Sequence, residues 1–137
     1  MLKLIRTTIL MLSLLTLSLG ATACCQITGG EPTIERAVTC QDVTENYEPI
    51  NETTTYAPGD TFYCSVKVSN LQKDQVVTWK WYFGDEFLYE QPLVLEKSGS
   101  GYIAAYLTND QLWPTGDYKV EVYLDGTLTK TVNFSVQ

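Results

Sequence analysis

The stretch YKVEVYLDGTLTKTVNFSV, residues 118–136, decides the fold of this chain. Apolar and polar side chains alternate along both of its halves, and Asp125-Gly126 separates the halves. Alternation with a period of two predicts β-strands with one buried and one solvated face, which pair in antiparallel sheets. Asp-Gly favours a tight hairpin because both turn positions need a positive φ. The segment therefore predicts two paired strands at the C-terminal end.

The same period recurs upstream in two strong segments and, more weakly, in three others: 61–68 and 76–83, then 34–43, 87–95 and 102–107. Pro92 inside one of the weaker segments marks an edge strand, because proline has no N–H to donate to a ladder. No segment shows a convincing helical period. Seven short strands in a chain of this length predict an all-β, antiparallel β-sandwich.

Two spacings add to this pattern. Cys64 on the second predicted strand is followed by Trp79 on the third, and Gly116-Asp117-Tyr118 leads into the penultimate strand. In these features the chain resembles the immunoglobulin-like superfamily, where such a tyrosine forms a corner and the tryptophan packs in the core. The family's second cysteine falls here at Val120, so the bridge between sheets found in antibody domains is absent. The resemblance covers residues 34–137 and implies an Ig-like (fibronectin III-like) fold.

Five motifs follow one another along the chain: Pro58-Gly59-Asp60, Trp81, residues 113–118 (WPTGDY), residues 123–126 (YLDG) and residues 134–136 (FSV). Their order is also similar to that of Ig-like modules of exported prokaryotic lipoproteins. That resemblance implies a fold and a location, but neither an activity nor a site.

The N-terminus has the organisation of an export signal. A basic start, an apolar run and small residues precede a cysteine: Lys3, Arg6, 9–19, Ala21, Ala23 and Cys24. This resembles a lipoprotein-type signal peptide, in which the cysteine after the cleavage site receives a diacylglyceryl group. We therefore expect a signal peptide over residues 1–23 and a lipid at Cys24. The protein would then be exported and anchored on the extracytoplasmic side of a membrane, at the cell surface or in the periplasm.

Two alternatives stay open at this end of the chain. Ordinary cleavage before Cys24 would release an unlipidated protein, and a retained N-terminal helix would anchor the domain on the same side of the membrane. In the lipidated form, residues 24–33 are a short tether and residues 34–137 form a single domain, since about a hundred residues suffice for one domain and no more.

Export would permit disulfides among the four cysteines. With Cys24 lipidated, three remain. Cys40 and Cys64 both lie in strand-like segments, and we expect a disulfide between them. Cys25 is then the odd cysteine, and its role stays open. No metal site is expected from these cysteines, because the chain has no C-x-x-C and no histidine.

The composition argues against several functions. Without histidine there is no Ser-His or Cys-His pair for nucleophilic catalysis, so we expect no enzyme and no cofactor. The formal net charge of −7 argues against nucleic acid as a partner. Aspartates occur in the expected loops, but no Asp-x-Asp-x-Asp spacing suggests a calcium loop.

Aromatic residues are the remaining candidates for ligand contact. Trp79 and Trp81 fall on the apolar face of a predicted strand, where core packing explains them. Trp113, beside Pro114, has two interpretations: it caps one end of the core, or it stands at a loop tip and contacts a ligand. Other tyrosines are better candidates for exposure than the strand tryptophans: Tyr63, Tyr82, Tyr106 and Tyr123. Segments 76–83 and 118–124 are expected to be neighbours in one sheet. On the outer face of this sheet, antiparallel pairing would bring Lys80 near Glu121, which predicts a charged rather than an aromatic surface.

Together these observations predict a non-enzymatic module of the cell envelope. The favoured hypothesis is a protein–protein interaction through loops or an exposed strand edge such as the one near Pro92, or a purely structural role. The alternative is a carbohydrate or cell-wall binding module that uses exposed aromatic side chains. Exposure of Trp113 together with a tyrosine on the same side would favour the alternative, whereas a buried Trp113 favours the first hypothesis.

Overall fold

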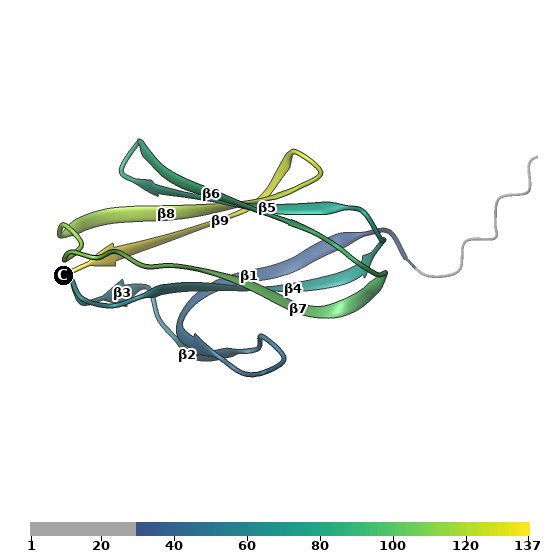
Figure 1. Cartoon of the computed structure of the whole chain (residues 1–137), viewed down its shortest axis with the longest axis horizontal. Coiled ribbons are helices and arrows are strands. Elements are labelled where there is room, and N and C mark those ends of the chain that lie inside the picture. Colours follow the sequence, from purple (N-terminus) through teal and green to yellow (C-terminus); the bar gives the residue numbers. More distant parts are fainter. Residues whose placement is uncertain (1–29) are drawn as a thin grey trace, which may run out of the picture.

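The computed structural model describes residues 30–137, which fold as two packed sheets without any helix (Figure 1). All strand pairs are antiparallel except the short β3–β9 pair, which is parallel. One sheet has the strand order β2-β1-β4-β7 and the other has the order β3-β9-β8-β5-β6. The nine strands are β1 (Thr33–Val43), β2 (Pro49–Glu52), β3 (Thr55–Tyr56), β4 (Phe62–Leu71), β5 (Val76–Phe83), β6 (Glu86–Val94), β7 (Gly99–Leu107), β8 (Gly116–Leu124) and β9 (Thr127–Val136). The expected all-β sandwich is confirmed, with two short strands, β2 and β3, beyond the seven expected. Within this range no helix is long and apolar enough to cross a membrane.

The C-terminal hairpin forms as its sequence predicts. β8 pairs with β9 in antiparallel register, and the turn between them holds Asp125 at φ 49° and Gly126 at φ 86°. The carboxylate of Asp125 accepts hydrogen bonds from the backbone N–H of Val76 at 2.9 Å and from the Gln75 side chain at 2.8 Å. These bonds hold the pKa of Asp125 below its ordinary value, first through Val76 and then through Gln75. The turn thereby ties β8 to the start of β5.

A cluster of aromatic rings fills one part of the core. Phe62 is fully buried at its centre. Five other rings lie with their centroids between 4.4 and 6.3 Å from the ring of Phe62: Tyr56, Trp81, Trp113, Tyr118 and Phe134. Stacked and edge-on aromatic pairs stabilise a core beyond the apolar area that they bury. Because these rings come from both sheets and from the β7–β8 connection, they hold the two layers together.

The immunoglobulin-like features expected from the sequence are present. The Tyr118 hydroxyl donates to the Pro114 carbonyl at 2.7 Å, which is the hydrogen bond of a tyrosine corner. Trp79 is buried, and its indole Nε1 has no hydrogen-bond partner. Burial raises the pKa of the Cys64 thiol to about 12. Trp79 and Cys64 belong to the same buried core cluster, as the spacing suggests.

Cys40 and Cys64 are free, buried thiols in the structure, so the disulfide expected between them is not formed. The register explains why. Cys64 lies opposite Thr39, whereas Cys40 lies opposite Tyr63. Residues directly opposite in an antiparallel pair share a face and adjacent residues do not, so Cys64 points into the core and Cys40 points away from it. A bulge between Ile34 and Arg36 sets this register.

The predictions for the signal peptide over residues 1–23, for lipid at Cys24 and for the role of Cys25 lie outside the described residues. The expected tether, residues 24–33, enters the described part at Gly30, and β1 begins at Thr33.

Candidate functional site

Trp113 is buried, with 8% of its surface exposed. Its ring stacks on Phe62 with the centroids 4.4 Å apart, and its Nε1 donates to the Asp60 carbonyl at 2.8 Å. A large aromatic side chain with its polar atom satisfied by the backbone closes the end of the core. This geometry favours the capping interpretation of Trp113 over ligand contact.

The outer face of the β5–β8 pair is charged, as expected. Lys80 lies opposite Glu121 in the register. Lys80 and Lys119 each lie over a tyrosine ring, with Nζ 4.6 Å from the centroid of Tyr123 and 4.9 Å from that of Tyr82. The Tyr123 hydroxyl donates to Glu121 at 2.8 Å, and this bond raises the pKa of Tyr123 to about 12. Both rings are covered by ammonium groups, so the face offers no free aromatic platform.

A second pair of tyrosines meets on the other sheet. Tyr63 on β4 lies opposite Tyr106 on β7, and their ring centroids are 5.8 Å apart. Tyr106 is 57% exposed. The sequence identified both residues as candidates for exposure, but the pairing depends on β4 and β7 being neighbours, and neither segment shows that by itself.

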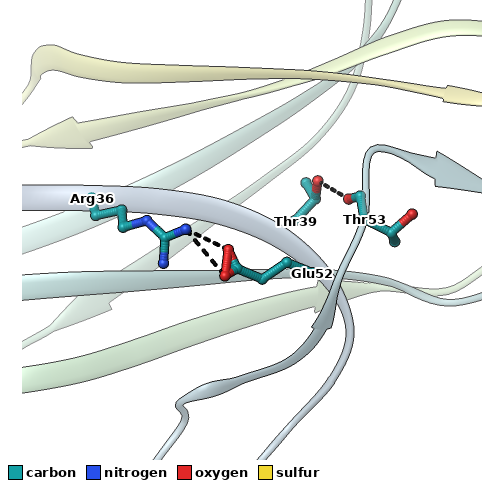
Figure 2. Close-up of polar contacts among 4 residues, drawn as sticks. All are labelled: Arg36, Thr39, Glu52 and Thr53. Atoms are coloured by element: carbon teal, nitrogen blue, oxygen red, sulfur yellow. Dashed lines mark hydrogen bonds and ion pairs between the residues drawn. The ribbon is translucent and has the colours of Figure 1, made fainter.

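A groove of about 570 Å³ with a mixed polar and apolar lining lies between β1, β9 and the β2–β3 connection. Figure 2 shows the side chains beside it: both oxygens of Glu52 accept hydrogen bonds from Arg36, and the Thr39 hydroxyl donates to the Thr53 carbonyl at 2.5 Å. These groups satisfy one another and fasten the β2–β3 connection to β1. The arrangement is typical of a structural contact rather than of a ligand site.

The opposite side of the sandwich exposes apolar side chains. β6 forms the edge of its sheet, which confirms the edge strand expected at Pro92. Of the nine large apolar side chains that are exposed within residues 30–137, five lie on β6 and on the neighbouring edge strand β7: Phe87, Tyr89, Leu93, Val94 and Tyr106. A groove of about 660 Å³ is lined by two of them, Leu93 and Val94, and by Tyr47, Tyr102 and Ala104 among others. We call this set of exposed residues the β6–β7 edge surface.

Gln91 connects the two sheets at this surface. Its Oε1 accepts a hydrogen bond from the buried Trp81 Nε1 at 2.7 Å, and its Nε2 donates to the Tyr106 carbonyl at 2.7 Å. One side chain thereby links β5, β6 and β7. Both edge strands are held at a fixed distance, so the surface is preorganised.

Among residues 30–137 no group of three histidine, cysteine or carboxylate side chains is placed to hold a metal ion. The loop aspartates instead serve their own turns. Asp60 accepts the Ala57 N–H at 2.8 Å, and Asp125 caps β5 as described above. These contacts are ordinary turn chemistry for aspartate.

No known protein family model matches the chain, and no curated protein matches it significantly. Among solved structures it is similar to an immunoglobulin-like protein from Pseudomonas aeruginosa, with 15% identity and a TM-score of 0.54. The match covers 80% of this chain and 98% of that one. At this identity the similarity shows the immunoglobulin-like fold alone.

A second solved structure that matches is an alkylpurine DNA glycosylase from Pseudomonas fluorescens bound to DNA containing an abasic site analog. The identity is 13% and the TM-score 0.47, over 80% of this chain and 31% of that one. This similarity is too low to support a functional argument.

Proposed function

We propose that this protein is a non-enzymatic, lipid-anchored module of the cell envelope that binds another protein through the β6–β7 edge surface. The observation that carries the proposal is the gathering of exposed apolar side chains on two adjacent edge strands. Exposed apolar side chains that concentrate at one edge of a molecule are typical of interaction sites, and edge strands are common docking elements. Anchoring through Cys24 would hold this surface at the membrane, within reach of other envelope proteins.

The burial of Trp113 supports a protein partner over a carbohydrate one, because the largest candidate for stacking on a sugar is part of the core. The formal net charge of −7 supports the same choice over nucleic acid. The absence of histidine from the sequence supports a non-enzymatic role.

Photo-cross-linking in the cells that make the protein tests this proposal. A photoreactive amino acid replaces Tyr89 on the surface or, as the control, Leu128 in the β8–β9 hairpin; both positions are about half exposed. We expect a discrete protein adduct from position 89 and none from position 128. Equal adducts from both positions, or none from either, would contradict a specific surface. Intact mass of the protein extracted from its membranes tests the anchor: a diacylglyceryl or triacyl increment at Cys24 is expected.

One observation favours a second candidate function. The Tyr63–Tyr106 pair offers an exposed aromatic surface that a sugar ring can stack on. Carbohydrate binding therefore remains the alternative, and a glycan array distinguishes it: binding that is lost in Tyr106→Ala but kept in Tyr89→Ala would replace the protein-binding proposal.

A further inference from the structure

β7 differs from the other described edges of the two sheets. β2 and β3 are short edges of four and two residues. β6 carries Pro92, two glutamates and a bulge near Leu88, all of which hinder pairing with another strand. β7 runs over nine residues, GSGYIAAYL, without a charge or a proline. The irregularity in its pairing with β4 lies at its first residues, opposite Val68–Leu71, and leaves Tyr102–Tyr106 in regular register. Long edges without such protection are templates for strand addition.

The backbone of β7 also presents free hydrogen-bonding groups. The Tyr106 carbonyl accepts its bond from Gln91, which is not on β4. Tyr63, opposite Tyr106, directs its own carbonyl toward β1: the Tyr56 hydroxyl that donates to it at 3.3 Å also donates to the Cys40 carbonyl of β1 at 2.6 Å. Tyr63 and Tyr106 are therefore a pair without mutual hydrogen bonds. Pairs with and without mutual hydrogen bonds alternate along an antiparallel ladder. The backbone N–H and C=O groups of every second residue, Tyr102, Ala104 and Tyr106, therefore point away from β4. The Tyr106 carbonyl has a second lone pair for a further donor.

The sequence of this edge is nearly the same in both directions. Tyr102-Ile103-Ala104-Ala105-Tyr106 is close to a palindrome centred on Ala104. Two copies placed antiparallel about Ala104 set Tyr102 of one copy opposite Tyr106 of the other, and Ala104 opposite itself. All three residue pairs then consist of outward-pointing groups and exchange two hydrogen bonds each.

We propose that a second copy of this chain pairs with β7 about a two-fold axis at Ala104, joining the two four-stranded sheets into one. The inference rests on the proposed function, because it names the partner of the β6–β7 edge surface. The side chains fit this register. Tyr102 and Tyr106 share the outer face of the sheet with Lys67 and Tyr63, so the tyrosines of the two copies meet as cross-strand aromatic pairs. Ala104, at the axis, is small enough for two strands to approach.

The experiment compares the mass of the full chain with that of three variants, each purified in mild detergent, over a range of concentrations. Ala104→Lys places two like charges across the axis, and Ala104→Pro removes an N–H that β4 does not use. Leu112→Lys is the matched control, since Leu112 is 71% exposed in the β7–β8 connection. We expect a dimer for the wild type and the control. For both Ala104 variants we expect a dissociation constant that is at least ~10-fold higher.

Hydrogen exchange measured by NMR tests the register. At dimer-forming concentrations the amides of Tyr102, Ala104 and Tyr106 should exchange slowly, and on dilution they should become fast, whereas the Ala105 amide, which faces β4, stays slow in both. A chain that is monomeric at all concentrations, or a dimer that persists in both Ala104 variants, would overturn the proposal. If the chain is monomeric while position 89 still cross-links to a different protein, the second copy is excluded and the protein-binding function stands.

Discussion

Replacing Gln91 with leucine tests the link between the two sheets. The substitution removes the acceptor of the Trp81 Nε1–H, and Trp81 is 1% exposed, so water cannot replace Gln91 as the acceptor. A buried donor without a partner costs about 1–3 kcal/mol. The hydrogen bond to the Tyr106 carbonyl is also lost, but that carbonyl lies at an exposed edge where water substitutes.

We therefore expect Gln91→Leu to lower the free energy of unfolding by about 2 kcal/mol. For a domain of this size each kcal/mol lowers the melting temperature by about 4–8 °C. Urea unfolding followed by far-UV circular dichroism measures the free-energy change. Gln111→Leu, in the exposed β7–β8 connection, is the matched control and should change stability by less than about 0.5 kcal/mol.

A double-mutant cycle with Trp81→Phe identifies the cause of the loss. In the Trp81→Phe background there is no indole donor to leave unpaired, so Gln91→Leu should cost at least about 1 kcal/mol less than it does in the wild type. An equal cost in both backgrounds would refute the reasoning, because the loss would then come from packing at position 91 and not from the orphaned donor.

Four further predictions follow from the fold. Tyr118→Phe removes the hydroxyl that donates to the Pro114 carbonyl, and it should lower stability by about 1 kcal/mol in urea unfolding; an unchanged midpoint would mean that this hydrogen bond contributes nothing. Trp113→Ala should cost about 3–5 kcal/mol, since it removes a buried ring stacked on Phe62, and a loss below 1 kcal/mol would show that Trp113 does not close the core. The Asp125 carboxyl has a lowered pKa in the folded state, so its contribution to stability is present above the pKa of an unfolded aspartate, about 3.9, and is lost as the pH falls through the lower folded value. Below about pH 4 the wild type should therefore lose more stability than Asp125→Asn in acid unfolding. Parallel curves of stability against pH for the two proteins would contradict this. Cys40 and Cys64 should both react with a thiol reagent in denaturant without reductant and resist it in the native state; if both react only after reduction, the bridge expected from the sequence exists.

The strands that the sequence predicts best are those in which a strict period of two runs without interruption. β4, β5 and β8 each keep one face buried, so alternation shows both the strand and its inner face. In β9 this holds only near the C-terminal end: a register shift places Leu128, expected on the apolar face, opposite Tyr123, and Leu128 is 47% exposed. The pairing of Lys80 with Glu121 follows from the same alternation once β5 and β8 are neighbours. β2 and β3 were missed because two to four residues are too few to show a period, and their positions depend on pairing with β1 and β9.

The expected Cys40–Cys64 bridge shows where such reasoning ends. Ile34 and Cys40 are an even number of positions apart, so an uninterrupted strand would point both side chains to the core. The bulge between Ile34 and Arg36 inserts one extra residue and reverses this order. Ile34 stays on the core face and Thr39 turns to it, whereas Cys40 turns to the other face of its sheet, where it is still fully buried. The residue type at a bulge need not be distinctive, and Glu35 gives no signal.

For the candidate surface, too, one part can be predicted from the local sequence and another part only from the strand order. Proline in a strand is a local signal, and Pro92 correctly indicated that β6 is an edge. β7 contains no such signal, and its uncharged sequence is equally suited to the middle of a sheet. Its meaning depends on the strand order: at a central position the sequence would be ordinary, but at an edge it leaves the outward groups of Tyr102 and Ala104 without the protection that β6 has. Once the strand order shows that β7 is an edge, its lack of protective residues becomes evidence for a partner strand.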